Sequence, residues 1–239
     1  MPEFIHTGKD KKKFVEDMFD DISGNYDMLN RTLSFGIDKY WRKKLIKSMN
    51  ISDDQYILDI ATGTGDVLFE INKHHKATAV GLDISKKMLN VANIKLTKIK
   101  NQNTKIEFIH GDAEKLPMGD NSYDHICISF GFRNLGNYDI ALKEFYRVLK
   151  PGGKLSILEF SKSESKFFNN IFQFYFNRIL PKIASFISRA DAYRYLPESV
   201  KYFPHQSKIN EFLENNNFSE IIVTPLTLGV ATIYNGIKK

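Results

Sequence analysis

The clearest candidate for chemistry in this chain is a glycine-containing loop between an apolar, strand-like segment and a helix-patterned one. The loop begins at Asp59 and contains Gly63, Thr64 and Gly65. Glycines at such a turn let the backbone bend sharply and approach a ligand closely, while the first amides of the following helix stay unpaired. We therefore expect these residues to form a cradle for a cofactor.

The residues around this loop indicate which kind of cofactor it holds. A dinucleotide-binding loop needs a third glycine where this chain has Leu68, so nothing favours a pyrophosphate. Asp83 ends the next predicted strand, where an acid can accept hydrogen bonds from ribose hydroxyls. The sulfonium cofactor S-adenosylmethionine has a ribose and no phosphate, and it fits both features. The alternatives are an ordinary strand-to-helix turn and an aspartate that only caps the following helix.

Alternating strand-like and helix-like segments must position this loop. Such alternation is typical of a parallel sheet with crossover helices, and it predicts a Rossmann-like α/β fold. The predicted strands are Tyr56–Ile60, Ala77–Asp83, Lys105–His110, Tyr123–Phe130 and Lys154–Phe160. The predicted helices between them lie near Val67–Lys73, Lys86–Lys98 and Ile140–Leu149.

The whole chain, residues 1–239, is predicted to form one domain, because no Pro/Gly/Ser-rich linker interrupts it. Its expected parts are an N-terminal helical cover (1–50), a cofactor-binding core (51–160), a helical insertion or lid (161–205), and a C-terminal helix with an antiparallel edge hairpin (206–239). Within the insertion, a helix-patterned stretch from Lys166 to Ile187 is apolar on nearly all sides. Such a helix is either buried in the protein or in contact with another apolar phase.

Composition narrows the choice of partners and compartment. The chain has 34 basic and 28 acidic side chains but no dense basic stripe, which argues against a nucleic-acid binder. No apolar stretch approaches the ~20 residues of a bilayer span. The lysines near the N-terminus are expected to be a solvated helix start, with attraction to anionic lipid headgroups as the alternative; they are Lys9, Lys11, Lys12 and Lys13. Cys127, the single cysteine, is expected to pack in the core of a protein from a reducing compartment.

Several motifs along the chain are those of one known family. They are Lys39-Tyr40-Trp41-Arg42, the glycine loop, Gly111-Asp112-Ala113-Glu114-Lys115-Leu116-Pro117, Phe130-Gly131-Phe132-Arg133-Asn134, Lys150-Pro151-Gly152-Gly153, Leu158-Glu159-Phe160-Ser161 and Tyr193-Arg194-Tyr195-Leu196. In these motifs, which span nearly the whole chain, the sequence resembles the ubiquinone/menaquinone biosynthesis C-methyltransferases. The resemblance implies a class I methyltransferase fold with a seven-stranded, mostly parallel sheet. It also implies methyl transfer from S-adenosylmethionine to a ring carbon of a polyprenylated benzoquinol or of demethylmenaquinol.

The same resemblance implies a set of cofactor contacts. In the family's pattern they fall on Thr64, Asp83, Asp112 with Ala113, and Ser129. Asp112 differs from the asparagine that some members have before the alanine. Either side chain can accept a hydrogen bond from the adenine amino group, so only the quality of that contact changes.

Methylation of a quinol ring asks the site to orient the ring, stabilise a phenolate and accept a proton. Arg133 and Asn134 follow the fourth predicted strand at its carboxyl end, where ligands of open α/β sheets gather. We expect Arg133 to stabilise the phenolate or orient a water, with a structural ion pair as the alternative. Tyr26 is a candidate to bind the quinol oxygen, or a packing residue. Asp191 is a candidate proton acceptor, or a helix cap.

The remaining expectations concern metals, partners and location. No spacing of histidine, cysteine and carboxylate residues suggests a metal, and His125 is expected to be structural. A polyprenylated quinol substrate implies a cytoplasmic protein in peripheral contact with the inner face of the membrane, as a homodimer or in a quinone-biosynthesis complex. The alternatives are a methyltransferase acting on another lipid, such as a sterol or phospholipid headgroup, and a non-catalytic subunit of a biosynthetic assembly.

Overall fold

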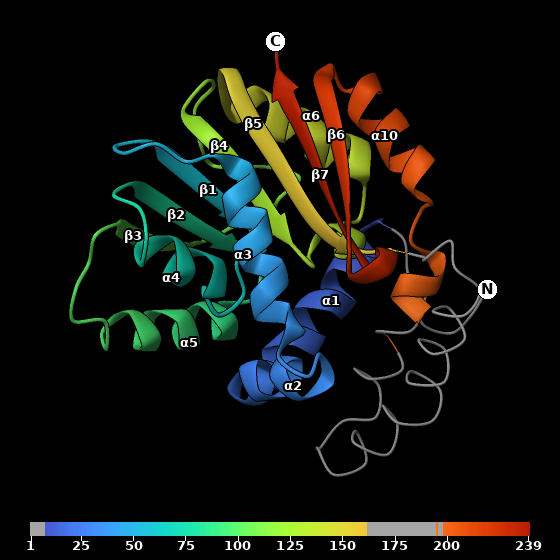
Figure 1. Cartoon of the computed structure of the whole chain (residues 1–239). Coiled ribbons are helices and arrows are strands. Elements are labelled where there is room, and N and C mark those ends of the chain that lie inside the picture. Colours follow the sequence, from blue (N-terminus) through green and yellow to red (C-terminus); the bar gives the residue numbers. More distant parts are fainter. Residues whose placement is uncertain (1–7, 162–194, 196–197) are drawn as a thin grey trace.

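One sheet of strands forms the centre of the molecule in a computed structural model that describes residues 8–161, 195 and 198–239 (Figure 1). In this part of the chain the sheet has seven strands in the order β3-β2-β1-β4-β5-β7-β6. The strands are β1 (Tyr56–Ile60), β2 (Thr78–Asp83), β3 (Lys105–His110), β4 (Tyr123–Ser129), β5 (Leu149–Phe160), β6 (Phe218–Leu226) and β7 (Ala231–Lys238). The predicted class I methyltransferase sheet is thereby confirmed.

The direction of the strands locates a binding edge. Strands β1 to β5 are parallel, whereas β7 pairs antiparallel with both β5 and β6. The predicted edge hairpin is therefore present, and its reversed strand is β7, one position in from the edge. The chain builds the sheet outward from β1 to β3 and then in the other direction from β4, so the strand order switches between β1 and β4. Ligands of open α/β sheets bind outside the carboxyl ends of the strands at such a switch.

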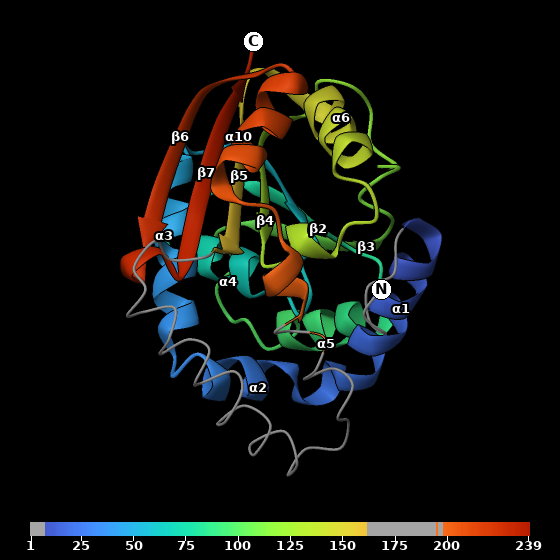
Figure 2. The ribbon, with the colours of Figure 1, turned by 90° about the vertical axis from the view of Figure 1, so that its right-hand side faces the viewer.

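Helices cover both faces of the sheet (Figure 2). They are α1 (Gly8–Ile22), α2 (Tyr26–Leu33), α3 (Ile37–Met49), α4 (Asp66–Asn72), α5 (Lys86–Leu96), α6 (Tyr138–Val148) and α10 (Gln206–Asn215). Helices α3 and α4 pack on one face, and α6 and α10 pack on the other. Helices α1 to α3 precede the first strand, and α1 and α2 lie across the end of the molecule where the parallel strands point (Figure 1).

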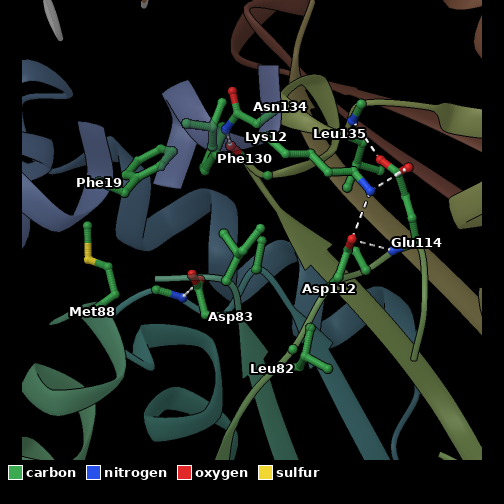
Figure 3. Close-up of a pocket in the computed structure, with 18 of the residues that line it drawn as sticks. Lys12, Phe19, Leu82, Asp83, Met88, Asp112, Glu114, Phe130, Asn134 and Leu135 are labelled. Atoms are coloured by element: carbon green, nitrogen blue, oxygen red, sulfur yellow. Dashed lines mark hydrogen bonds and ion pairs between the residues drawn. The ribbon is translucent and has the colours of Figure 1, made fainter. Parts of the chain in front are cut away.

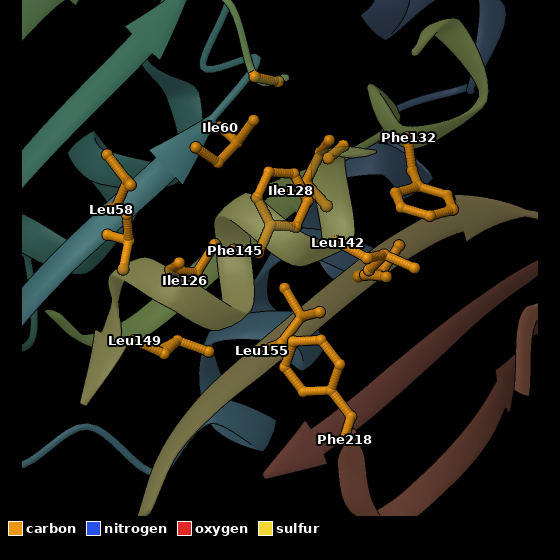
Figure 4. Packing of buried hydrophobic residues seen from close by; sticks show 14 of the residues in the cluster. Leu58, Ile60, Ile126, Ile128, Phe132, Leu142, Phe145, Leu149, Leu155 and Phe218 are labelled. Atoms are coloured by element: carbon orange, nitrogen blue, oxygen red, sulfur yellow. The ribbon is translucent and has the colours of Figure 1, made fainter. Parts of the chain in front are cut away.

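The core follows from the two-residue period of the strands, which sends alternate side chains to opposite faces. On β4, Ile126 and Ile128 join the cluster under α6 and α10, which Figure 4 shows, while Cys127 between them joins the cluster under α3 and α4. Cys127 is fully buried, as its apolar setting predicted. The packing of the core therefore fixes the position and direction of β1 and β4, and the carboxyl ends of these strands form the site.

One predicted strand has a different start in the structure, and one predicted helix lies outside the described residues. The predicted fifth strand begins five residues early, because Pro151 and the glycines after it lie within β5 and do not form a separate turn. The helix predicted for residues 166–187 and the residue Asp191 lie outside the described residues. In the described part of the chain, no helix has the length and apolarity needed to cross a bilayer.

Candidate active site

Two adjoining cavities lie at the carboxyl ends of β1, β2 and β4. The first encloses about 700 Å³ of empty space, part of it open to solvent, and reaches from the end of β1 toward α1 (Figure 3). The second encloses about 350 Å³ between the loop after β1 and helices α2 and α3. The residues that line both are Tyr26, Ala61, Gly63, Ser129 and Phe130. The cavities are therefore two parts of one site, divided by the predicted cofactor loop.

Strained backbone marks the point where the strand order switches. Ala61 directly after β1 and Phe130 directly after β4 have φ angles of 51° and 58°, in the left-handed region that non-glycine residues rarely adopt. Such a conformation costs about 1–3 kcal/mol and persists only where the surrounding structure imposes it. Both residues line both cavities, so the strain lies at the centre of the site.

The two glycines of the loop have different roles. Gly63 has a φ of 57° and lines both cavities, where an added Cβ would meet only Tyr26 Cε1, at 3.7 Å. Gly65 has a φ of 84° and lines neither cavity, and an added Cβ there would lie 2.7 Å from Phe108 Cζ. Gly63 can thus approach a ligand, whereas Gly65 is required for the turn into α4 and for packing.

Asp83 joins the loop after β1 to the one after β2. Its Oδ2 accepts a hydrogen bond from the amide of Gly63 at 2.7 Å, and its Oδ1 accepts one from the amide of Ser85 at 2.8 Å. The N-cap of α5 is Ser85 itself, whose Oγ accepts from the amide of Met88. Burial raises the pKa of Asp83 to about 6. The carboxylate lines the first cavity, where the expected contact with a ribose would lie.

Asp59 is the corresponding acid of the second cavity. It accepts a hydrogen bond from Thr62 Oγ1 at 2.6 Å, and Cys127 Sγ lies 3.4 Å from its other oxygen. Burial raises the pKa of Asp59 to about 7. Among the described residues neither Asp59 nor Asp83 forms an ion pair with a basic side chain. Two buried acids without a basic partner favour a ligand that carries positive charge.

Three more of the predicted cofactor contacts line the first cavity. They are Asp112, Ala113 and Ser129. Ser129 Oγ is buried and has no hydrogen-bond partner among the described residues. Since buried polar atoms are nearly always hydrogen-bonded, a bound ligand is a natural partner for this hydroxyl. The residues present therefore fit the cofactor that the sequence indicated.

Two of the N-terminal lysines differ from the sequence prediction, because they bind groups at the site. Lys11 Nζ donates at 2.8 Å to the carbonyl oxygens of Arg133 and Leu135, and burial lowers its pKa to about 8. Lys12 Nζ lies 2.8 Å from both Asp112 Oδ2 and Glu114 Oε2, as Figure 3 shows. The expectation of a solvated helix start is wrong for these two lysines, because α1 folds back over the carboxyl edge of the sheet.

Tyr26 was a candidate to bind the quinol oxygen, with packing as the alternative. It begins α2, lines both cavities and lies beside Gly63. Burial raises the pKa of its hydroxyl, which therefore stays protonated at neutral pH. Its ring also packs edge to face on Phe19, with centroids 5.9 Å apart. The packing role and the ligand-facing role are compatible.

Arg133 forms the structural ion pair that was its alternative. Its Nη1 donates to Glu159 Oε1 at 2.7 Å and to the carbonyl oxygen of Phe130 at 2.6 Å, and its side chain lines neither cavity. Glu159 is fully buried and also accepts from the backbone amide of Arg133. Asn134 does line the first cavity, and its Oδ1 accepts from Tyr195 Oη at 2.9 Å. The structure thus brings Asn134 to the cavity and turns Arg133 away from it.

His125 is structural, as expected. It is 5% exposed, its Nε2 lies 2.9 Å from Gln55 Oε1, and burial lowers its pKa to about 4. It lines neither cavity. Within the described ranges, no group of three or more histidine, cysteine or acidic residues is arranged to hold a metal ion.

The chain matches known proteins over nearly its whole length. Residues 6–238 match the ubiE/COQ5 methyltransferase family. The chain belongs to this family. It is 40% identical over 231 residues to the ubiquinone/menaquinone biosynthesis C-methyltransferase UbiE of Geotalea daltonii, covering 96% of this chain and 98% of that one. It is 37% identical over 231 residues to a demethylmenaquinone methyltransferase of Porphyromonas gingivalis, covering 95% and 94%.

A solved structure supports the same assignment of the fold. A SAM dependent methyltransferase from Aquifex aeolicus superposes with a TM-score of 0.61 at 21% identity, over 83% of this chain and 89% of its own. At this identity the likeness concerns the fold alone. Membership of the family makes the chain an S-adenosylmethionine-dependent methyltransferase, and the solved structure supports its class I fold.

Sequence analysis assigned no role to several residues of the site. Arg42, Glu114 and Glu159 lie in family motifs, so their positions were marked but their partners were not. Lys12 was expected in solvent, because its partner Asp112 is 100 residues away and no local pattern indicates their contact. Contacts across such separations arise only when the cover folds onto the sheet.

Proposed function

We propose that this enzyme transfers a methyl group from S-adenosylmethionine to a ring carbon of a polyprenylated benzoquinol or of demethylmenaquinol. The observation that carries the proposal is the buried site at the end of β1. There Asp59 and Asp83 form no ion pair with any basic side chain of the described residues and face cavities with aromatic walls. A cationic cofactor and an aromatic ring both suit such a site. The printed names of the relatives, which include both ubiquinone/menaquinone and demethylmenaquinone enzymes, favour this substrate class.

Each part of the cofactor has a suitable partner in our proposal. Asp83 would accept from the ribose hydroxyls, and Asp112 from the adenine amino group. The amide of Ala113, which donates to no acceptor among the described residues, would bind the adenine ring, and Ser129 would gain the hydrogen bond it lacks. Gly63 would let the backbone approach the sulfonium centre.

The second cavity suits the amino-acid end of the cofactor. Asp59 would bind the ammonium group, and Arg42, which lines the same cavity, would bind the carboxylate. Arg42 Nη1 already binds Asp38 and lies 3.5 Å from Asp66 Oδ2, so the carboxylate would bind the other nitrogens of the guanidinium group. Calorimetry with S-adenosylhomocysteine and with 5′-methylthioadenosine, which lacks the amino-acid end, checks this assignment. The Asp59→Asn variant should bind only the first ligand more weakly.

The catalytic proposal concerns the ring and its proton. S-adenosylmethionine supplies a methyl group on a sulfonium sulfur, so the chain must orient the quinol and stabilise its phenolate. Asn134 and the protonated hydroxyl of Tyr26 would bind the quinol oxygens from two sides of the first cavity. Arg133, held by Glu159 and bonded to the carbonyl of Phe130, would position the loop that carries Asn134 and contribute its charge from behind it. Asp191 stays our candidate for the proton acceptor, and no step requires a metal.

The substrate also suggests where the enzyme works. A polyprenyl tail keeps the quinol in a bilayer, so we propose a cytoplasmic enzyme in peripheral contact with the inner face of the membrane. A homodimer or a complex with other quinone-biosynthesis enzymes is compatible with that location. The mass of the purified protein in solution tests the dimer directly.

The decisive experiment is mass spectrometry of the quinones in cells that lack this protein. Accumulation of a quinone without its ring methyl group would support the proposal and would identify the benzoquinol or the naphthoquinol as the substrate. Re-expression of the intact protein should restore the normal quinones, and re-expression of the Asp83→Ala variant should restore them poorly. Normal quinones in the deleted strain would contradict the proposal.

A further inference from the structure

The outward surface of α3 combines exposed apolar side chains with charges of a single sign. Ile37 and Tyr40, one turn apart on this helix, are 39% and 48% exposed. The exposed charged side chains of α3 are all basic, whereas its one acid, Asp38, is buried against Arg42. The basic ones are Lys39, Lys43, Lys44 and Lys47, of which Lys43 lies 3.8 Å from Glu70 Oε1 of α4.

The turn before α3 adds an aromatic side chain to this surface. Phe35 is 75% exposed, and its φ of 51° lies in the left-handed region, where a bulky residue is a genuine outlier. The strained turn thus carries a largely exposed aromatic side chain, whereas phenylalanine is more often buried. Scattered exposed apolar residues need no explanation, but three within six residues beside four lysines form a patch.

The geometry points to an anionic lipid bilayer as the partner of this patch: we propose that Phe35, Ile37 and Tyr40 enter the headgroup region while Lys39, Lys43 and Lys44 bind lipid phosphates. This inference rests on the proposed function, because it is the polyprenylated substrate that would require the enzyme to meet a membrane. A helix with an apolar edge and an all-basic polar face lies in the plane of such an interface. Lys44 Nζ lies 5.4 Å from the ring centroid of Tyr40, so ring and ammonium group sit together at the depth where aromatic residues and lysines are stable.

Docking on this surface would bring the site to the membrane. The inward face of α3 carries Arg42, which lines the second cavity, and α2 carries Tyr26, which lines both. The Ile37 end of α3 lies beside α2, at the same end of the molecule as the carboxyl edge of the sheet (Figures 1 and 2). A quinol head leaving the bilayer at this surface would therefore have only the thickness of the helical cover to cross.

The test is sedimentation with vesicles of mixed phosphatidylglycerol and phosphatidylethanolamine, with phosphatidylcholine vesicles as the neutral comparison. The intact protein should sediment with the first and much less with the second. The double variant Phe35→Ser with Ile37→Ser should lose most of its vesicle binding. The matched control is Ile94→Ser, since Ile94 is 57% exposed on α5, away from the patch, and this variant should bind as the intact protein does.

Charge is tested separately from apolar contact. Replacing Lys43 and Lys44 by glutamine should weaken binding about 30-fold, on the basis of the usual contribution of a lysine at an anionic surface. Replacing Lys86 and Lys87, which are exposed on α5, removes the same charge and should have a much smaller effect. Equal losses for the two pairs would overturn the proposal, because they would indicate attraction by net charge alone.

Two further measurements separate the outcomes. All variants should bind S-adenosylhomocysteine normally and should methylate a short-tailed, water-soluble quinol at the rate of the intact protein. If the intact protein methylates no quinol, the proposed function fails, whatever the vesicles show. Unchanged vesicle binding by the Phe35→Ser, Ile37→Ser variant would overturn the docking surface. The docking surface would also be overturned if the intact protein were a dimer in solution and this variant a monomer. The patch would then bind a second copy of the chain.

Discussion

The loop after β1 and the loop after β4 meet at the same end of the sheet. They differ in whether the chain supplies a partner for the buried charged side chain of the loop. Each begins with a left-handed, non-glycine residue, Ala61 or Phe130. The acid of the first, Asp59, is buried and has no basic partner in the part of the chain that the structure describes. The base of the second, Arg133, is buried against Glu159 at 2.7 Å. A buried charge that the chain leaves unbalanced is available to a ligand. One that the chain itself balances holds the backbone in place.

The largest expected effect concerns the balanced loop. Glu159→Gln leaves Arg133 buried without its counter-charge, and removing one partner of a buried pair costs about 3–5 kcal/mol. We expect this loss in the free energy of unfolding measured with urea. The control is Glu211→Gln, because Glu211 pairs with Lys208 on the surface and such a pair contributes about 0–1 kcal/mol. Similar losses in both variants would mean that the Arg133 pair is not a structural one.

The next effect concerns the unbalanced loop and has a definite dependence on pH. The pKa of Asp59 is about 7 in the folded protein, above the usual value of about 3.9 for an unfolded chain. The folded state therefore binds more protons between these values, and the stability from Asp59 is lost as the pH rises through 7. Asp59→Asn removes this loss, so its stability relative to the intact protein should rise by roughly 3 kcal/mol between about pH 5 and about pH 8.

Urea unfolding across that pH range, without ligand, measures this difference. The matched control is Asp124→Asn, at the start of β4, because Asp124 pairs with Lys150 and is not left unbalanced. Its difference from the intact protein should change little over the same range. A constant difference for Asp59→Asn as well would show that Asp59 has a basic partner in solution, and the comparison of the two loops would fail.

A smaller effect is expected on binding. Asp83→Ala removes the proposed acceptor of the ribose hydroxyls and should weaken the binding of S-adenosylmethionine by about 1–3 kcal/mol. Calorimetry measures the change in Kd. The control Asp120→Ala alters an acid that is 68% exposed and lines neither cavity, so it should leave Kd unchanged. An unchanged Kd in a folded Asp83→Ala variant would remove Asp83 from the cofactor site.

The smallest effect concerns the cover that closes over both loops. Lys12→Ala removes a partly exposed ion pair to Asp112 and Glu114, and such pairs contribute about 0–1 kcal/mol. We expect little change in Tm but faster amide hydrogen exchange along α1, because the helix loses a direct contact with the sheet. Lys13→Ala, at an exposed neighbouring position, should leave the exchange unchanged. Equal exchange in both variants would show that Lys12 does not hold the cover.

The sequence predicted the strands, the cofactor loop and several of the residues at the cavities because these features are local. Strand periodicity, a glycine after a buried strand and an acid at a strand end are all visible within about ten residues. The partner of Arg133 was not visible in this way, because Glu159 lies on the next strand, 26 residues further along. The same holds for Lys11 and Lys12, whose polar side chains suggest solvent until α1 is folded onto the loops they bind.

By itself, then, the sequence determined the fold class, the kind of cofactor and the edge of the sheet that holds it, since backbone geometry and strand order follow from local patterns. Only the tertiary structure decided which charges at that edge are free and which are paired. The reason is physical: the free energy of a buried charge depends on the groups within a few ångströms of it, and folding brings those groups together from distant parts of the chain.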